Sequence, residues 1–482
     1  MTTSSIAQPS LESTRVEAIL NGLSAPNQAF TAVYPGESAR RQPVHSVYGG
    51  AQLFTAETTP RLGAKALEML HWYAPDPLDL GRAVGLPGCE HVDHSLDGEL
   101  AERMKKDPAE VKQDCYAAWL AHTIYRRVED KLKREPVEDY RIDFEDGYGN
   151  RPDAEEDGHA ASTAREVARA MKEGTLPPYI GIRIKPFSEE CKRRSVRTTD
   201  IFISELVRAS DGKLPDNFVV TIPKVTVPAQ AAALADLLDL LEQSLKLAQG
   251  SLKFEIMVET PQSIISREGR SPLLAMVEAG RGRCVAAHFG TYDYTASCQI
   301  TAAYQMMDHP ACMFALNMLK VSLIGTGLFL SDGATNIMPV PVHKGDILTP
   351  QQERENRQSV YHAWRLHYSH IQNSLRNGYF QGWDLHPGQL PTRYAAVYAF
   401  FLESLDGAAD RLKNFVERAA QATLLGDVFD DAATGQALLN YFLRAINSGA
   451  VSEAETVERT GLSIEELQGR SFLAILKNRS RV

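Results

Sequence analysis

Three carboxylates crowd the end of one strand-like segment of the chain. Residues 140–147 read YRIDFEDG, a run that closes on Asp143, Glu145 and Asp146. Carboxylates this close repel one another, and each raises the pKa of its neighbours. Because such crowding is costly unless cations compensate it, the segment indicates a polar site next to basic side chains or a metal ion.

Charged or polar side chains also stand near the ends of five further strand-like runs. In chain order they are Arg183 and Lys185, then Lys224, Glu259, Asp293 and His386. Taken singly, each has a structural explanation, because a strand-end acid commonly caps the next helix and an arginine commonly forms a buried ion pair. Acids and bases from six strands on one rim favour a chemical site. An all-oxygen ligand set of this kind suits Mg²⁺ or Mn²⁺.

The runs that carry these residues alternate with helical segments. Eight β-rich runs are expected, at residues 43–51, 140–147, 179–187, 218–225, 252–260, 284–293, 336–343 and 382–389. Helix signals separate them, such as the cap Asp107 followed by Pro108 and Glu110, and the helix start at Pro228. This alternation predicts a parallel sheet, and eight units predict a closed (β/α)₈ TIM barrel. An open doubly wound sheet is the alternative, but no GxGxxG or P-loop motif supports it.

The spacing of the runs also predicts the domain organisation. Residues 1–40 are expected to form an amino-terminal arm with a short helix, and residues 41–400 the catalytic barrel. The long interval between the first two runs predicts a helical insertion at about residues 52–139. Residues 401–482 are expected to form a carboxyl-terminal helical region, because capping boxes and helical periodicity continue there.

Bulk composition excludes several classes of protein. Of the 482 residues, 44% are hydrophobic and 23% charged, and the formal net charge is −10. This acidic balance argues against a nucleic-acid-binding face and against adhesion to an anionic membrane. No secretory signal or membrane-spanning run is visible. The six cysteines are scattered without a CxxC pair, so a reduced, cytoplasmic protein is expected.

Six short motifs in chain order resemble those of the citrate lyase β-subunit and HpcH/HpaI aldolase superfamily. That superfamily also includes malyl-CoA and citramalyl-CoA lyases, and malate synthase is a more distant relative. The motifs are DFED (143–146), GIRIKP (181–186), IPKV (222–225), IMVETPQSI (256–264), HFGTYDYTA (288–296) and DLHPGQ (384–389). The resemblance extends over about residues 43–390. Lys185 departs from the family pattern, which has asparagine at this position.

The resemblance implies a metal-dependent reaction of an oxo-acid. Glu259 and Asp293 match the two metal ligands of the superfamily, so Mg²⁺, with Mn²⁺ as a substitute, is the implied cofactor. Making or breaking a carbon–carbon bond next to a carbonyl develops enolate charge, which a Lewis-acid metal and a guanidinium stabilise. Arg183 matches the family's arginine and would bind substrate and stabilise that charge.

The remaining residues of the motifs would complete the site. The resemblance implies catalytic roles in proton transfer for Glu145, Asp146 and His386, and substrate-binding roles for Lys185, Lys224, Gly290 and Thr291. Lysines are equally frequent as salt-bridge partners, and a strand-end histidine before a Pro–Gly turn is equally frequent as a structural group. The small-molecule substrate would be an oxo-acid or hydroxy acid, with a coenzyme A thioester as an open alternative.

The sequence leaves two other functional hypotheses open. A Schiff-base aldolase would use the amine of Lys185 or Lys224 in place of a metal. A non-catalytic barrel would bind or assemble without turnover. The specific substrate, the direction of reaction and the subunit number are not determined by the residues, although the resemblance implies a homotrimer or homohexamer.

Overall fold

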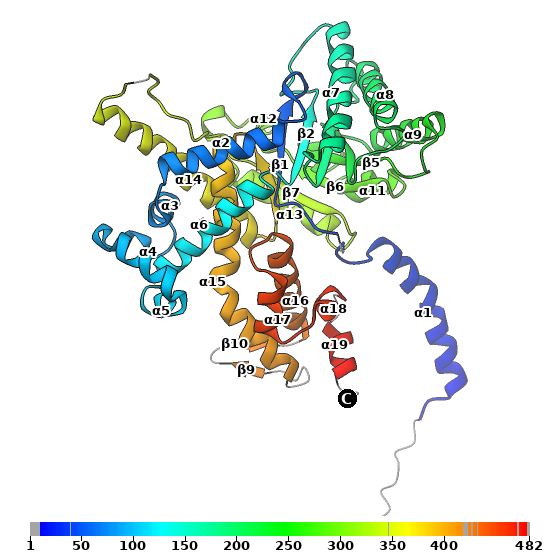
Figure 1. Cartoon of the computed structure of the whole chain (residues 1–482). Helices are drawn as coiled ribbons and strands as arrows, with labels where there is room; N and C mark the ends of the chain where they lie inside the picture. Colours follow the sequence, from blue (N-terminus) through cyan, green and yellow to red (C-terminus); the bar gives the residue numbers. More distant parts are fainter. Residues whose placement is uncertain are drawn as a thin grey trace, which may run out of the picture.

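A closed barrel of eight strands forms the centre of the molecule (Figure 1). The computed structural model describes residues 10–38, 40–345, 347–417, 423–425, 428–430, 432–469 and 472–479. All eight barrel strands are parallel, and β1 closes the barrel by pairing with both β2 and β8. The predicted TIM-barrel fold is confirmed.

Seven of the eight strands overlap the runs expected from the sequence, and β2 and β8 each begin one residue before theirs. The strands are β1 His45–Gly50, β2 Asp139–Asp143, β3 Tyr179–Arg183, β4 Phe218–Ile222, β5 Lys253–Val258, β6 Cys284–Phe289, β7 Phe329–Ala334 and β8 Gln381–Asp384.

The prediction for the seventh strand was wrong. Residues 336–343 are not in a strand, and β7 lies directly before them at Phe329–Ala334. Pro339 and Pro341 have no N–H group for a strand ladder, which excludes the expected run from the centre of a sheet. The true strand contains Ser331, Asp332 and Gly333, a polar pattern typical of a turn, but here all three residues are buried.

A series of helices separates β1 from β2. They are η1 Ala51–Leu53, α2 Thr58–Tyr73, α3 Pro77–Val84, η2 Cys89–His91, η3 His94–Leu96, α4 Asp97–Lys106, α5 Pro108–Asp114 and α6 Tyr116–Arg134. The Asp107 side chain accepts hydrogen bonds from the N–H groups of Ala109 and Glu110, as its capping signal predicts.

The other barrel helices follow their strands. They are α7 Asp153–Glu173, α8 Lys192–Ala209, α9 Pro228–Leu245, α10 Pro261–Ile264, α11 Leu273–Ala279, α12 Thr291–Ser297, η4 Ala302–Tyr304, α13 Pro310–Leu323, α14 Pro350–Arg376, η5 Pro387–Gln389 and α15 Leu390–Glu417. Large buried side chains such as Phe144, Phe202 and Phe289 belong to the apolar core between the sheet and these helices.

Elements at both ends of the chain lie outside the barrel. Helix α1 Ser13–Val33 extends away from the body (Figure 1). At the other end are the antiparallel strands β9 Thr423–Leu425 and β10 Val428–Asp430, and then α16 Ala432–Asn447, α17 Glu453–Thr460, α18 Ile464–Gln468 and α19 Phe472–Arg479. Within the described residues, no helix combines the length and apolar character that crossing a membrane requires.

A buried ionic network fills the amino-terminal half of the barrel. Arg141 donates from Nε to Glu255 Oε1 at 2.7 Å and from Nη2 to Oε2 at 2.9 Å, and it also pairs with Asp139. His288 Nε2 lies 3.2 Å from the same glutamate. Arg141 compensates both acids of this network, whereas Glu145 and Glu259 lie after the carboxyl ends of β2 and β5.

Candidate active site

Arg183 and Asp143 form the rigid side of the site. They are the last residues of β3 and β2 and lie opposite each other in the sheet register. Arg183 donates to both carboxylate oxygens of Asp143, from Nε at 2.7 Å and from Nη2. The N–H groups of Glu145 and Gly147 donate to the same carboxylate. Burial alone would raise the pKa of Asp143, but these partners lower it, so this acid is a fixed anion that orients the arginine.

The rest of the Arg183 guanidinium faces the carboxylates that follow β2. Nη1 lies 3.2 Å from Glu145 Oε2 and 3.6 Å from Asp146 Oδ2. The guanidinium carbon lies 4.9 Å from the centre of the Tyr48 ring, which covers one face. Burial opposes its charge, but the neighbouring carboxylates raise the pKa of Arg183 further. The arginine is therefore a permanent, oriented cation.

Lys224 connects the carboxylates that come from three other strands. Its backbone N–H donates to Glu259 Oε1 at 2.6 Å, and its ammonium pairs with Glu145 and lies 3.5 Å from Asp293 Oδ1. Its φ of 52° is in the left-handed region, which residues other than glycine seldom adopt. Such strained backbone concentrates at functional sites, and here it aims both the N–H and the side chain at the same cluster.

Glu259 is the buried acid of the cluster. It follows β5 directly and is 1% exposed. Burial and then the charge of Asp293 raise its pKa to about 8, against the opposing effect of Lys224. A Cβ at Gly290 would lie only 2.4 Å from Glu259 Oε2, so the glycine leaves the space that this carboxylate occupies. A divalent cation would stabilise the ionised form of a carboxylate that is buried and close to a second acid.

Asp293 is the second predicted metal ligand, and the structure brings it to the same cluster. It lies in the first turn of α12, after β6, and is 39% exposed at its side chain. Both Asp293 and Glu259 contact Lys224, and the repulsion between them contributes to the raised pKa of Glu259. The oxygen-only donor set fits a hard dication, which takes one or two carboxylates and completes its shell with water and substrate oxygens. Thr291 Oγ1, also predicted to be at the site, is buried without a hydrogen-bond partner.

A cavity of about 710 Å³ opens beside this cluster. Glu145, Asp146, Lys185 and Lys224 line it, together with Gln230 at the start of α9. Lys185 is held on the wall, because its ammonium lies 2.8 Å from Glu156 and donates to the carbonyl of Phe144 at 2.7 Å. The cavity is large enough for a small-molecule substrate.

His386 is placed differently from the other predicted residues. Its Nδ1 accepts a hydrogen bond from the N–H of Gly388 at 3.0 Å and so caps η5. Within the described part of the chain, no hydrogen bond or ion pair joins it to Arg183, Glu259 or Asp293. Burial, followed by the charge of Lys65, lowers the pKa of His386. Its proposed acid–base role stays a prediction.

A second group of possible metal ligands lies in the segment between β1 and β2. Asp79, His94 and Asp97 are the one set of three or more His, Cys, Asp or Glu in the described residues whose ligand atoms lie within 4.8 Å of one another. Arg82 already pairs with Asp97 at 2.8 Å and lies 3.7 Å from Asp79. This arginine compensates the acids, so the group needs no metal ion to account for it.

The structure adds residues that the sequence did not single out. Tyr48, from β1, packs at a tilt against Trp383 of β8 with 4.8 Å between ring centroids, and the two rings cluster with Met257. The Tyr48 hydroxyl and Trp383 Nε1 are buried without a hydrogen-bond partner. The only sequence signal was their position in strand-like runs of the barrel, because aromatic residues in strands are normally core residues.

The chain belongs to the family described as a domain of unknown function (DUF6986), whose sequence profile matches residues 23–475. A comparison with curated proteins finds no match.

Solved structures with a similar fold include a citrate lyase and a malate synthase. The citrate lyase from Burkholderia xenovorans LB400 is 19% identical, and the match covers 70% of this chain and 91% of that one, with a TM-score of 0.49. Haloferax volcanii malate synthase, solved as a lead(II) complex, is 16% identical. The match covers 75% of this chain and 93% of that one, with a TM-score of 0.42. CitE from Mycobacterium tuberculosis, solved with magnesium, acetoacetate and coenzyme A, is 14% identical. The match covers 68% of this chain and 95% of that one, with a TM-score of 0.41. These are proteins of the kinds that the six sequence motifs resemble.

Proposed function

We propose that the protein is a divalent-cation-dependent carbon–carbon lyase or aldolase. Its substrate is an oxo-acid, or a 2-hydroxy or 3-hydroxy acid, either free or as a coenzyme A thioester, and the reaction passes through an enolate. The observation that carries the proposal is the cluster of Glu259, Asp293 and Glu145 around Lys224, with the Arg183 guanidinium against Glu145. Mg²⁺, or Mn²⁺ in its place, is the cation that this oxygen-only set would hold.

Glu259 and Asp293 are the residues that would hold the cation. Bound there, it would supply a Lewis acid that polarises a carbonyl and stabilises negative charge on oxygen. The similar structures support this use of a metal, since CitE was solved with magnesium and the malate synthase with lead(II). Acetoacetate and coenzyme A, present with CitE, are of the substrate class proposed here.

The protein side chains account for the remaining chemistry. When the carbon–carbon bond breaks, its electron pair passes to the fragment that carries the adjacent carbonyl or thioester, as an enolate, and the hydroxyl of the other fragment loses its proton and becomes a carbonyl. Arg183, fixed by Asp143, presents a planar fork to the carboxylate or enolate oxygens. Glu145, whose pKa burial raises, accepts the hydroxyl proton and delivers a proton to the enolate carbon.

The structure disfavours the Schiff-base reading. An amine nucleophile must be neutral, and burial alone would lower the pKa of Lys224 toward that state. The charges of Glu145, Glu259 and Asp293 outweigh burial and raise the pKa above its ordinary value. Lys185 is paired with Glu156. The Lys224 ammonium is therefore stabilised in its charged form, and the Lys185 ammonium is engaged in an ion pair.

Proton exchange of pyruvate in D₂O tests the proposal without knowledge of the second substrate. We expect Mg²⁺-dependent loss of the pyruvate methyl signal in ¹H NMR, abolished by EDTA, restored by added Mg²⁺ and absent in Glu259→Gln. Titration calorimetry with Mg²⁺ alone should show binding to the wild type and at least tenfold weaker binding to Asp293→Asn. Exchange that survives EDTA, together with borohydride trapping of a lysine adduct, would replace the metal reading with the Schiff-base one.

A further inference from the structure

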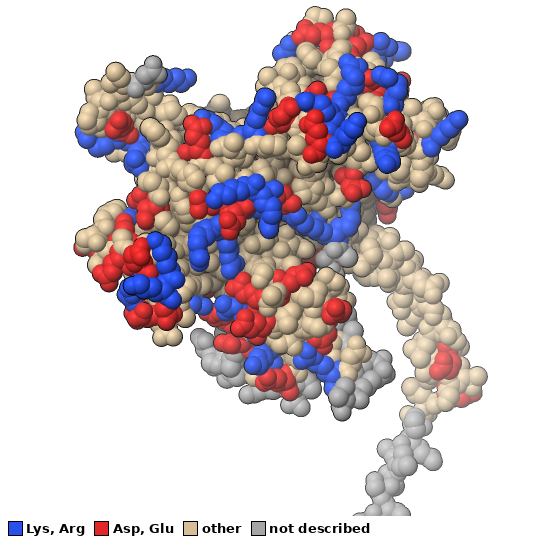
Figure 2. Space-filling view, viewed as in Figure 1, with Lys and Arg blue, Asp and Glu red and all other residues tan. Residues whose placement is uncertain are grey.

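Helix α1 is exposed to solvent on all sides in the described chain. Within the described chain it has no buried residue, and Ile19, Leu20, Leu23 and Phe30 are 68%, 51%, 50% and 65% exposed. Residues 18–33 contain no Lys, Arg, Asp or Glu. The contrast is visible in Figure 2, where most of α1 is tan while the body carries many red and blue side chains. Solvent-facing helices carry charge, whereas the cores of protein interfaces are depleted of it.

The apolar residues of α1 form one continuous stripe. Val16, Leu23 and Phe30 repeat every seven residues, and Ile19, Pro26 and Val33 form a second series three residues behind them. This spacing is the a/d pattern of a helix that packs along another helix. Glu17, Asn21, Ser24, Gln28 and Thr31 occupy a separate polar stripe. The sequence of α1 is therefore that of a helix with one side against a partner.

The helix has weak internal support. Pro26 has no N–H to donate within the helix, and Gly22 has high backbone freedom, so both residues destabilise an isolated helix in water. Most helical stability in proteins comes from packing of the apolar face. Since the described chain supplies no such packing, the covering surface must come from outside it.

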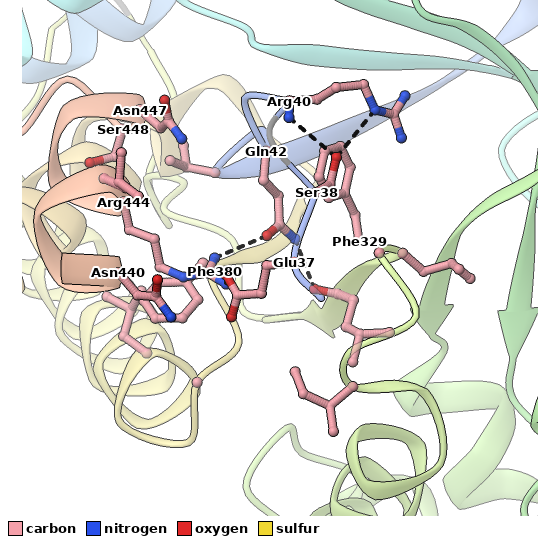
Figure 3. Close-up of a pocket in the computed structure, with 18 of the residues that line it drawn as sticks. Glu37, Ser38, Arg40, Gln42, Phe329, Phe380, Asn440, Arg444, Asn447 and Ser448 are labelled. Atoms are coloured by element: carbon pink, nitrogen blue, oxygen red, sulfur yellow. Dashed lines mark hydrogen bonds and ion pairs between the residues drawn. The ribbon is translucent and has the colours of Figure 1, made fainter. Parts of the chain in front are cut away.

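The segment that follows α1 is anchored to the body. The N–H of Gly36 donates to the carbonyl of Gly325 at 2.8 Å, just after α13. Glu37 lies 2.8 Å from Arg444 of α16, whose guanidinium also donates to Gln42 at 3.2 Å (Figure 3). Gly36 and Glu37 are therefore fixed on the body, and α1 extends from this point away from the barrel (Figure 1).

An exposed apolar face lies next to this anchor. On α13 and its carboxyl-terminal end, Phe314, Val321 and Ile324 are 49%, 77% and 48% exposed. Phe314 and Val321 are seven residues apart and share one side of the helix. Ile324 directly precedes Gly325, whose carbonyl accepts the hydrogen bond from Gly36, three residues after α1. The exposed apolar stripe of α1 and the exposed apolar face of α13 are therefore both adjacent to the anchored segment at Gly36 and Glu37.

We propose that α1 is an exchanged arm that packs on a second copy of this chain, against the face formed by Phe314, Val321 and Ile324. A 21-residue helix is about 31 Å long and about 10 Å across. In a reciprocal exchange each chain gives one arm and receives one, so the two contacts cover on the order of 600 Å² of each chain. This approaches the roughly 800 Å² per partner of a specific interface.

An anionic membrane surface fits α1 less well. Helices that lie on such membranes carry Lys or Arg along their polar face. The polar stripe of α1 contains Glu17, and Arg15 is the helix's one basic residue. Because the polar stripe has no Lys or Arg, it offers no electrostatic attraction to anionic lipid.

The mass of the full chain in solution, measured by light scattering after size exclusion and by sedimentation at several concentrations, tests the proposal. We expect an oligomer for the wild type and at least a tenfold weaker association for Leu23→Glu. Gln28→Glu places the same charge on the polar stripe of the same helix and should associate as the wild type does. Val321→Glu, on the receiving face, should weaken association as Leu23→Glu does.

The alternative outcomes are distinct. A wild-type chain that is monomeric at tens of micromolar would overturn the proposal, as would an oligomer that Leu23→Glu leaves intact. Association lost in Leu23→Glu but kept in Val321→Glu would refute α13 as the receiving surface. Flotation of the wild type with phosphatidylserine vesicles, lost in Leu23→Glu, would assign the arm to a membrane and overturn the exchange. None of these measurements depends on the proposed lyase activity.

Discussion

Glu259 carries a charge that its surroundings disfavour, and this has a consequence for stability. Burial and Asp293 raise its pKa to about 8, so ionisation of the group destabilises the metal-free fold at higher pH. In EDTA at pH 8.5, Glu259→Gln should therefore raise the melting temperature by about 1–4 °C, because a neutral amide still accepts the Lys224 N–H. Differential scanning fluorimetry should also show that Mg²⁺ no longer stabilises the variant.

Glu255 is the matched control for this prediction. It lies on β5, the strand that Glu259 follows, and is equally buried, but Arg141 outweighs burial and lowers its pKa. Glu255→Gln should destabilise the protein by about 3–5 kcal/mol, since it leaves a buried arginine partly uncompensated. If Glu259→Gln destabilised the protein to a similar extent, Glu259 would be a structural ion-pair partner and not an acid kept for a ligand.

Gly290 links the same acid to the strand beside it. An added Cβ would meet Glu259 Oε2 at 2.4 Å and its Cβ at 2.7 Å, so Gly290→Ala must displace the carboxylate. Because the φ of Gly290 is −97°, alanine brings no backbone strain of its own. Mg²⁺ affinity by calorimetry should fall at least tenfold. Gly158→Ala in α7, where an added Cβ meets nothing within 4 Å, should bind as the wild type does.

At the level of elements, strands were predictable where each ran as an apolar segment between helix signals. Pro228 begins α9 and Ser463 caps α18 with Glu466, because these residue types satisfy or omit the free N–H groups of a first turn. Strand β7 was missed because its buried polar residues look like a turn in the sequence. Asp332 illustrates this, since its buried carboxylate accepts from Ser374 of α14, a partner 42 residues away.

The site was predictable to the same degree and for the same reason. Acids and bases at strand ends indicated the rim of the barrel, because parallel strands end on one side. The central position of Lys224 was not predictable, since it depends on a left-handed backbone and on three carboxylates from other strands. The role of Tyr48 was also not predictable, because its contact with Arg183 joins two different strands and has no characteristic spacing in the sequence.

Helix α14 and strand β8 share a contact that should make stability depend on pH. His367 Nε2 lies 3.0 Å from Asp384 Oδ1, and Asp384 also accepts from His45 and Arg393. Burial lowers the pKa of His367 to about 4, although Asp384 opposes this effect. Between pH 6.5 and 4 the unfolded chain then binds a proton that the folded chain does not, so the free energy of unfolding decreases as the pH falls.

Urea unfolding at pH 7 and pH 5 measures this dependence. His367 should contribute a loss of about 2 kcal/mol between these values, and His367→Gln, which does not titrate, should remove that part of the loss. His362→Gln, on the exposed side of the same helix, should keep the wild-type dependence. An unchanged difference in His367→Gln would mean that the histidine is already protonated in the folded state.

For the whole molecule, the arm and the catalytic rim are separate structures. The cluster is supplied by the ends of β2 to β6 of one chain, whereas α1 shares no buried surface with that rim in the described residues. Dissociation by Leu23→Glu should therefore leave Mg²⁺ affinity and the rate of pyruvate proton exchange per chain within about twofold of the wild type. Measurement of the exchange rate over a range of protein concentrations checks this, because a site completed by a partner would lose activity on dilution as the oligomer separates. A rate that falls in parallel with the oligomer fraction would show that the neighbouring chain contributes to catalysis.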